Sequence, residues 1–240
     1  MIRFVDETGS TNADLLALGT DAREGDWLVA RRQSAGRGRS GRLWQDGAGN
    51  FMGSTVVRLR PGDPPAQTLA LVAGLAGRQA VGAVAAGLPA RLKWPNDLLL
   101  AGAKLAGVLL ERAGETVVVG IGVNLAQTPQ VEGRESTSLF AHGVTVAPSD
   151  FAEVLADRFA VLLAAWRDGD WPRLRELWLA NAHPVGTVLE VRDPNGARIA
   201  GAFAGLGADG SALLRLADGS TRPIHAGDVE LVGDGNAAGG

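Results

Sequence analysis

The spacing of apolar residues predicts a chain that mixes strands with helices. Short runs rich in Val, Ile and Leu are typical of buried strands. The strands predicted in this way are 2–6, 27–31, 51–58, 91–94, 98–100, 104–111 and 116–124. Elsewhere apolar residues recur every three or four positions, which indicates amphipathic helices. The predicted helices are 10–18, 65–86, 149–167 and 171–180. We expect Gly74 and Gly77 to break or loosen the second of them.

The pattern changes at about residue 184, where strands become short and turns frequent. The predicted strands there are 188–191, 198–206, 213–216, 221–224 and 229–232, and the turn sequences between them are DPNG, ADGS and ADGS. Turns at such close intervals indicate a small β-barrel. We therefore expect two domains, residues 1–182 and residues 183–235, in a protein of the α+β class.

Composition narrows the possible functions. The 240 residues carry a net charge of −3 and a pI of about 5.6, which argues against a general nucleic-acid binder. The chain has no cysteine, so disulfides, thiolate catalysis and cysteine-ligated metals are excluded. It has three histidines, none with metal-ligand spacing. The first residues lack the pattern of a signal peptide, and no apolar run is long enough for a membrane span. A cytoplasmic protein without membrane contact is expected.

The sequence QSAGRGRSGRLW at residues 33–44 is the strongest functional signal. It sets Arg37, Arg39 and Arg42 among three glycines and ends on Trp44. Glycine permits close backbone approach to a ligand, and guanidinium groups bind phosphate or carboxylate oxygens in a planar fork. We interpret the segment as a cationic lid that is disordered when empty and closes over an anionic ligand.

Several familiar catalytic motifs are absent. The GxGxxG spacing inside residues 33–44 is not a dinucleotide-binding turn, because no helical pattern follows it. The chain contains neither GxxxxGK[ST] nor GxSxG, and it offers no Ser-His-Asp set. Lysine occurs only at Lys93 and Lys104, in a chain that otherwise uses arginine for its basic side chains. The site is therefore expected to work by binding and fixed charge.

Three segments are expected to converge: residues 33–44, the hairpin from Lys93 to Lys104, and the end of the strand at 120–124. Fixed positive charge around a polyanion suits adenylation of a carboxylate, because it removes the repulsion between the carboxylate and the α-phosphate of ATP. Plainer interpretations stay open for two elements. Ser10 or Thr11 is also a natural helix N-cap, with Asp14 completing a capping box, and Asn96 with Asp97 after a proline is also a natural turn.

Taken together and in order, five sequences resemble the biotin protein ligase family. They are STN at 10–12, QSAGRGRSGRLW at 33–44, KWPNDLLL at 93–100, KLAGVLLE at 104–111 and GIGVN at 120–124. The resemblance implies a class II synthetase-like fold, with a mixed β-sheet catalytic domain and flanking helices, followed by an SH3-like β-barrel. It is to the monofunctional ligases without an N-terminal DNA-binding domain, so DNA binding is not expected.

The same resemblance implies substrates and residue roles. Biotin and ATP with Mg²⁺ give biotinyl-5′-AMP, and biotin then passes to a lysine of a biotin carboxyl carrier protein. The catalytic residues implied are Lys104 and Arg39. Biotin would contact Ser10, Thr11, Asn12, Gln33, Gly36, Arg37, Gly38, Arg39, Lys104 and Gly107. ATP would contact Arg39, Arg42, Trp44, Lys93, Asn96, Asp97 and Asn124. Asp97 is the candidate that would position the metal ion.

Three other interpretations are open. A lipoate or octanoate ligase or transferase shares the fold, although the glycine–arginine loop and the C-terminal barrel favour biotin. A nucleic-acid-binding protein with an RG-type loop is disfavoured by the acidic balance. A structural protein with an SH3-like interaction module would leave the three polar segments far apart in space.

Overall fold

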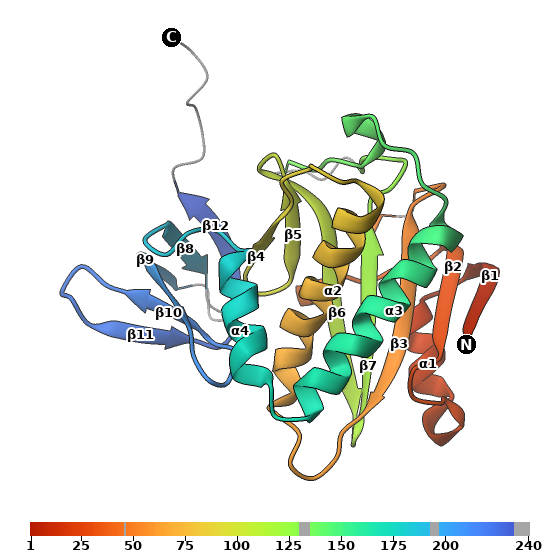
Figure 1. Ribbon diagram of the computed structural model, residues 1–240, viewed down its shortest axis with the longest axis horizontal. Helices are drawn as coiled ribbons and strands as arrows, with labels where there is room; N and C mark the ends of the chain where they lie inside the picture. The colour runs from red at the N-terminus through yellow and green to blue at the C-terminus, as the bar shows by residue number, and fades with distance from the viewer. Residues whose placement is uncertain (46, 130–134, 193–196, 233–240) are drawn as a thin grey trace.

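The computed structural model describes residues 1–45, 47–129, 135–192 and 197–232, and it contains two β-sheets and four α-helices (Figure 1). The larger sheet has the strand order β1-β2-β3-β7-β6-β5-β4. Its strands are β1 (Ile2–Thr8), β2 (Trp27–Gln33), β3 (Phe51–Arg58), β4 (Arg91–Lys93), β5 (Asp97–Leu100), β6 (Ala103–Ala113) and β7 (Thr116–Val123). β1 and β2 are parallel and the other neighbours are antiparallel, so the predicted mixed sheet is confirmed.

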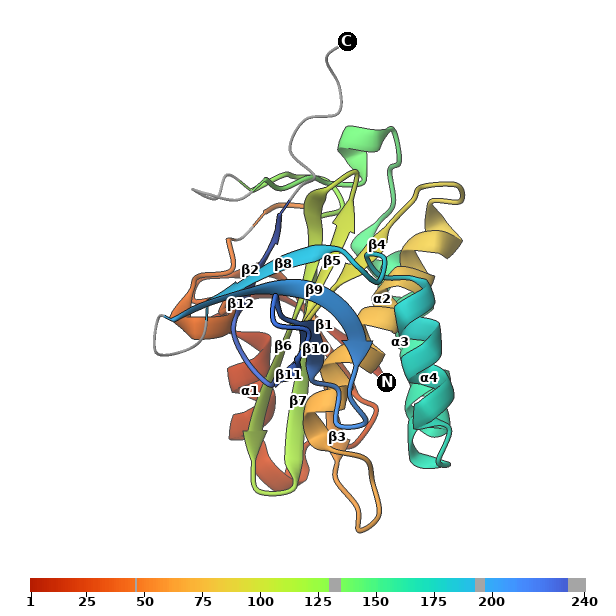
Figure 2. The ribbon, with the colours of Figure 1, turned by 90° about the vertical axis from the view of Figure 1, so that its left-hand side faces the viewer.

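The four helices cover the two faces of this sheet unequally. They are α1 (Thr11–Ala17), α2 (Leu69–Val84), α3 (Pro148–Arg167) and α4 (Trp171–Ala180), and short 3₁₀ turns lie at Gly19–Asp21, Arg39–Gly41, Ala66–Thr68 and Phe140–His142. Figure 2 shows α1 on one side of the sheet and the other three helices on the opposite side. The α1 side is thus left partly open for other segments of the chain.

Alternation along the strands explains why the two faces differ. Val117 and Val119 of β7 join the large apolar core beneath α2 and α3. Val118, between them, points to the opposite face, where it packs with Val56 of β3 and Leu15 of α1 in a much smaller core. Because successive side chains of a strand point to opposite faces, every second residue of β3, β6 and β7 faces the α1 side. The residues that continue this series beyond α1 face the site described below.

Two local predictions about helices were wrong. α2 runs without a break through Gly74 and Gly77. A side chain at Gly74 would press on Leu92, so this glycine allows close packing of the helix rather than breaking it. The capping box is also absent, because Ser10 is the N-cap of α1 and accepts from the backbone N–H of Ala13 at 3.4 Å. Asp14 instead accepts a hydrogen bond from the hydroxyl of Thr8.

The C-terminal strands form a second, fully antiparallel sheet of the kind found in SH3-like domains. Its order is β11-β10-β9-β8-β12. The strands are β8 (Val188–Arg192), β9 (Arg198–Leu206), β10 (Ala212–Arg215), β11 (Thr221–Ile224) and β12 (Asp228–Val232). In Figure 2, β9 arches strongly. The turn predicted at DPNG, and the last residues of the predicted second domain, lie outside the described residues. The division at residue 182 stays a prediction.

The two sheets share contacts and one apolar core. Trp94 Nε1 donates to the carbonyl of Gly210 at 3.0 Å, and Trp171 Nε1 donates to that of Ala208 at 2.6 Å. Phe203 and Leu189 of the second sheet belong to the same cluster of buried residues as the core beneath α2 and α3. The turn at residues 208–211 is therefore fixed against the larger sheet, which keeps the second sheet beside the loop at residues 33–44.

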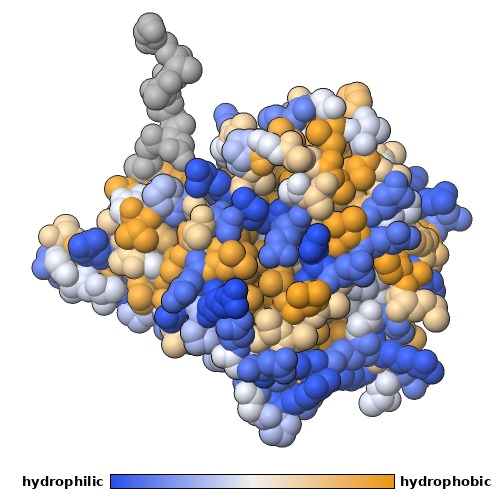
Figure 3. Space-filling model, in the orientation of Figure 1, coloured by the Kyte–Doolittle hydropathy of each residue, from blue (hydrophilic) through white to orange (hydrophobic). Residues whose placement is uncertain are grey.

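No helix within the described ranges combines the length and the apolar character needed to cross a bilayer. On the face that Figure 3 shows, which is the helical face of Figure 1, apolar and polar residues are interspersed.

A charged cluster joins the last residue of α3 to two segments of the N-terminal part of the chain, at Glu24 and Arg58. Arg167 donates to both oxygens of Glu24, at 2.5 and 2.7 Å, and to the carbonyl of Arg58 at 2.6 Å. The hydrogen bond from Arg167 lowers the pKa of Glu24 below its ordinary value of 4.5. The carboxylate is thus ionised in the folded protein at every pH above that value.

We expect Glu24→Gln to lower the free energy of unfolding by about 2 kcal/mol at neutral pH, because it removes the nearer of two carboxylates that pair with Arg167 and leaves only Asp63, at 3.6 Å. The loss is smaller than for a fully buried pair, since 24% of the Glu24 side chain is exposed. A lowered folded-state pKa gives stability above pH 4.5 that disappears as pH falls through the folded pKa. Urea unfolding from about pH 7 to about pH 3 should show the two proteins converging below pH 4.5. A constant difference across that range would contradict the assignment.

Candidate active site

A cavity of about 340 Å³ lies on the α1 side of the large sheet and brings the three predicted segments together. Of the residues predicted to contact biotin, it is lined by Ser10, Thr11, Asn12, Gln33, Arg37, Gly38, Arg39, Lys104 and Gly107. All the residues predicted to contact ATP line it: Arg39, Arg42, Trp44, Lys93, Asn96, Asp97 and Asn124. Gly36 is buried behind the loop and does not line the cavity. Convergence of the segments rules out the purely structural interpretation.

Two glycines stand side by side on neighbouring strands in the floor of the cavity. Gly122 of β7 lies between Met52 of β3 and Gly107 of β6 in the strand register. These residues continue the series that faces α1, but glycine leaves the space there empty. The Trp44 indole fills it: a Cβ added to Gly122 would overlap the indole, and one added to Gly107 would lie 3.3 Å from it. Gly122 of GIGVN and Gly107 thus form the seat of Trp44, and with it of the loop.

We expect Gly122→Ala to lift Trp44 from its seat and leave the fold intact. The new methyl group occupies indole space, and such overpacking costs about 1–3 kcal/mol, which corresponds to hydrogen exchange of the loop amides about 5- to 150-fold faster. Hydrogen–deuterium exchange of residues 36–45 measures this. Gly82→Ala in α2 is the matched control, because nothing lies within 4 Å of the added methyl group. Unchanged exchange in Gly122→Ala would mean that the glycine does not seat the loop.

Polar groups at the start of α1 form a chain of hydrogen bonds at one end of the cavity. The backbone N–H of Thr11 donates to Gln33 Oε1 at 2.8 Å. Ser54 Oγ lies 2.6 Å from Thr11 Oγ1 and donates to Asn12 Oδ1 at 2.6 Å. Asn12 Nδ2 donates to Glu111 Oε2 at 2.8 Å, and Arg37 pairs with the other oxygen of Glu111 at 3.3 Å. This end of the cavity therefore combines hydrogen-bonding groups with one ion pair, in which Glu111 balances the charge of Arg37.

The loop at residues 33–44 folds back on itself and contacts the second sheet. Trp44 N donates to the carbonyl of Gly36 at 2.9 Å, and Gly38 N donates to that of Arg42 at 2.7 Å. Arg42 forms an ion pair with Asp228 of β12. Arg39 donates to the carbonyl of Gly227 at 3.2 Å and to Asn96 Oδ1 at 3.0 Å. Closure only upon ligand binding stays a prediction.

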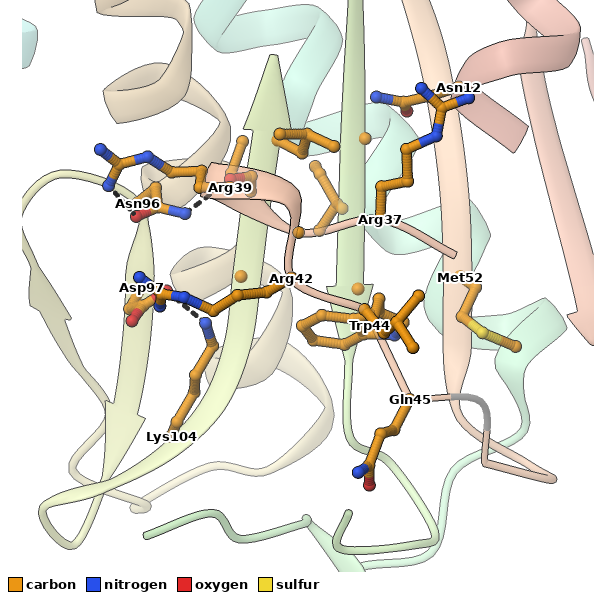
Figure 4. A pocket seen from close by; sticks show the side chains of 18 of the residues that line it. Asn12, Arg37, Arg39, Arg42, Trp44, Gln45, Met52, Asn96, Asp97 and Lys104 are labelled. Atoms are coloured by element: carbon orange, nitrogen blue, oxygen red, sulfur yellow. Dashed lines mark hydrogen bonds and ion pairs between the residues drawn. The ribbon is translucent and has the colours of Figure 1, made fainter. Parts of the chain in front are cut away.

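Cationic groups gather at the other end of the cavity, as Figure 4 shows. There Arg39, Asn96, Asp97 and Lys104 lie across the pocket from Asn12. Lys104 Nζ donates to Asp97 Oδ1 at 2.6 Å, and 19% and 11% of the two side chains are exposed. The Lys104 ammonium also lies 5.8 Å from the centre of the Trp44 ring. Because this ammonium is partly buried in surroundings of low dielectric constant, it interacts more strongly with an anion than it would in water.

The two asparagines predicted on the nucleotide side have structural partners as well. Asn96 Nδ2 donates to the carbonyl of Val108 at 2.7 Å, which fixes the turn before β5 against β6. Asn124 Nδ2 donates to the carbonyl of Thr137 at 2.9 Å. Asn96 thus lies in a turn, as the plainer interpretation predicted. It also accepts a hydrogen bond from Arg39 at the cavity wall.

Ser54, Glu111 and Asp228 were missed by the sequence analysis. Glu111 ends the quoted sequence KLAGVLLE, but nothing in that sequence shows which residue it would contact. Ser54 sits in a strand that reads as ordinary core, and Asp228 lies in the C-terminal strands. The signal that could have found Glu111 and Ser54 is strand alternation, since both belong to the series that faces α1.

Comparisons with known proteins agree with this geometry. The family model described as "Biotin/lipoate A/B protein ligase family" matches residues 2–126. The biotin–[acetyl-CoA-carboxylase] ligase of Paracoccus denitrificans is 41% identical over 221 residues, which cover 87% of this chain and 91% of that protein.

Among the solved structures similar to this chain, two match it over nearly its whole length. The biotin protein ligase of Aquifex aeolicus in complex with biotin and ATP has a TM-score of 0.84 and 26% identity, and the match covers 96% of this chain and 97% of that one. The biotin protein ligase of Leishmania major in complex with biotinyl-5-AMP has a TM-score of 0.65 and 26% identity, over 94% and 98% of the two chains. The family match, the close relative and the shared fold together establish that this chain belongs to the biotin/lipoate A/B protein ligase family.

Proposed function

We propose that the protein is an ATP-dependent biotin ligase, which forms biotinyl-5′-AMP and transfers biotin to a lysine of a biotin carboxyl carrier protein. The observation that carries the proposal is the division of one cavity into two ends. At one end hydrogen-bonding groups surround Arg37, whose charge Glu111 balances, and at the other end the cations Arg39, Arg42 and Lys104 gather. Biotin has the same division, because its ureido ring is neutral with N–H and C=O groups and its valeryl chain ends in a carboxylate. The ureido ring fits the end at Thr11 and Gln33, and the carboxylate reaches Lys104.

Residue roles follow from this orientation. Ser10, Thr11, Asn12 and Gln33 bind the ring of biotin, while Arg37, Gly38 and Gly107 shape the wall around it. Gly36 does not touch the ligand, but its carbonyl accepts from the backbone N–H of Trp44 and so supports the loop. The triphosphate of ATP lies against Arg39, Arg42 and Lys93, and Trp44, Asn96, Asp97 and Asn124 complete the nucleotide side. The ion pair between Arg42 and Asp228 means that the phosphates compete with a carboxylate for Arg42.

Adenylation requires the biotin carboxylate oxygen to attack the α-phosphorus of ATP, with the bond to pyrophosphate breaking as the new P–O bond forms. Lys104 carries three N–H donors. One donates to Asp97, so two are left for a carboxylate oxygen and an α-phosphate oxygen. Holding both anions on one ammonium aligns them and offsets their repulsion, and it stabilises the charge that develops on phosphorus. Asp97 keeps the Lys104 side chain directed into the cavity.

Mg²⁺ fits the residues present, although they offer few ligands. Within the described ranges no three His, Asp or Glu side chains are grouped to hold a metal ion. Mg²⁺ in nucleotide sites needs only one or two carboxylates, since phosphate oxygens and waters complete its shell. Lys104 donates to Oδ1 of Asp97 at 2.6 Å, so the other oxygen, Oδ2, is the one that would bind the metal ion. The ion would neutralise phosphate charge there.

The second step transfers biotin to the carrier. The neutral amine of the carrier lysine attacks the carbonyl of the mixed anhydride, an amide bond forms and AMP leaves. Because the anhydride also reacts with water and with other amines, it must be enclosed until the carrier arrives. The loop at residues 33–44, seated through Trp44 and held at Arg39 and Arg42, supplies that cover.

Incubation with biotin, ATP and Mg²⁺ in the absence of any acceptor tests the proposal directly. We expect biotinyl-5′-AMP bound to the protein and one pyrophosphate released for each, and we expect a carrier domain to receive biotin from that complex. Lipoate and octanoate in place of biotin serve as the comparison. Pyrophosphate exchange with lipoate but not with biotin would overturn the proposed substrate.

A further inference from the structure

Glu111 of β6 joins three separate parts of the site through one carboxylate. Its Oε2 accepts from Asn12 of α1 at 2.8 Å, and its Oε1 accepts from Arg37 of the loop at 3.3 Å. Both partners line the cavity, whereas Glu111 stands behind them. In the strand register Glu111 lies opposite Val118, on the face that carries α1. It therefore acts on any ligand through its neighbours.

An ionised carboxylate only accepts hydrogen bonds, and this fixes the orientation of the Asn12 amide. Because Nδ2 of Asn12 must point to Glu111, its carbonyl oxygen points to Ser54. Asn12 is almost fully buried, with 4% of its surface exposed, and it rests directly on Gly120. The amide thus has no room to adopt a different position, although it could exchange its two ends by a half-turn.

The orientation of Asn12 in turn fixes the protons of two hydroxyl groups. A hydroxyl has a single proton to donate. Ser54 donates its proton to Asn12 at 2.6 Å, so in its other contact, 2.6 Å from Thr11 Oγ1, the Thr11 hydroxyl must be the donor. Gln33 Oε1 is a second acceptor for the Thr11 proton, but it lies farther away, at 3.2 Å, and it already accepts from the backbone N–H of Thr11 at 2.8 Å. With its proton directed at Ser54, Thr11 offers the cavity a lone pair.

We propose that Glu111 is a positioning residue that makes the Thr11 hydroxyl an acceptor for an N–H group of the ligand. The inference rests on the proposed function, in which that N–H belongs to the ureido ring of biotin. Glutamine at position 111 can donate as well as accept, so it permits the half-turn of Asn12. The chain of hydrogen bonds then reverses. Thr11 accepts a hydrogen bond from Ser54, and its own proton becomes available to donate, so the Thr11 hydroxyl is no longer restricted to accepting from the ligand.

The test compares Glu111→Gln with the wild-type chain in binding biotin and its two ureido N-methyl derivatives. The wild type should reject one derivative strongly, since methylation removes the N–H that Thr11 accepts. In Glu111→Gln the ratio of the two dissociation constants should shrink about tenfold, because the bond that methylation removes is already weakened. The bulk of the methyl group is common to both proteins and cancels in this comparison.

Glu115→Gln, at the turn between β6 and β7, is the matched control. Its carboxylate is 73% exposed and pairs only with Arg112 among the ion pairs of the described residues. Its discrimination ratio should equal that of the wild type. Ser54→Ala, which cuts the same chain one link later, should shrink the ratio as much as Glu111→Gln and replaces it if that variant does not fold. The double variant should shrink the ratio no further.

The outcomes distinguish a failure of the role proposed for Glu111 from a failure of the proposed function. A wild-type ratio in a folded Glu111→Gln or Ser54→Ala chain that still binds biotin would overturn the role of Glu111 and leave the proposed function standing. A wild-type chain that binds no biotin would overturn the proposed function itself.

Discussion

Lys104→Ala is expected to slow formation of biotinyl-5′-AMP by about 100- to 1,000-fold, the usual cost of removing one group that stabilises charge in a transition state. Biotin affinity should fall by about tenfold at most, because the ureido end of the cavity is unchanged. The two effects differ because the ammonium meets the α-phosphate and the carboxylate together only as they react. Single-turnover formation of the adenylate gives the rate, and calorimetry gives the affinity.

Two further variants show whether the charge of Lys104 or only its bulk is responsible. Lys104→Met keeps the length of the side chain and its contact with Trp44, and it should be as slow as Lys104→Ala. Lys104→Arg keeps the charge and its pairing with Asp97, and it should recover part of the rate. Normal turnover in Lys104→Met would remove the residue from the mechanism.

The second large effect is expected for Arg39→Ala. This change removes the hydrogen bonds from the loop to Asn96 and to the carbonyl of Gly227, together with one cation near the phosphates. Hydrogen bonds from a charged donor contribute about 1.5–3 kcal/mol. Release of the adenylate should therefore be about ten- to 100-fold faster, as measured by rapid gel filtration of the preformed complex.

Faster release has a visible consequence, because free adenylate reacts with any exposed amine. The Arg39→Ala protein should biotinylate a bystander protein that has no carrier domain, whereas the wild type should not. Arg31→Ala is the matched control: it removes another arginine of the same region, at the exposed end of β2, where it pairs with Asp6 at the surface. Tight retention of the adenylate by Arg39→Ala would contradict the lid.

The elements of this fold were largely predictable from the sequence, because strand and helix patterns are local. The strand at 51–58 and the helix at 171–180 were predicted to the residue. The errors arose where tertiary packing outweighed local preference. Gly74 lowers the helix propensity of α2, but the glycine lies against Leu92 in a closely packed core, and burial outweighs that cost.

The site was predicted as a set of segments, and its internal connections were not. Motif sequences pointed to Lys104, Arg39 and Asn12, all of which line the cavity. The pairing of Lys104 with Asp97, of Arg42 with Asp228 and of Asn12 with Glu111 depends on strand register and on the position of the second sheet. Such partners lie far apart in the chain, and no local pattern specifies them.

The anchoring of the loop by β12 has a consequence for the order in which the protein matures. Arg39 and Arg42 reach partners that lie 188 and 186 residues later in the chain. During synthesis on the ribosome the guanidinium loop emerges early, followed by Asn96 and the glycines under Trp44, but the partners at Gly227 and Asp228 emerge only after both sheets have nearly been made. In a nascent chain these two contacts of the loop therefore form last. An incomplete enzyme that formed an adenylate would release it into solution.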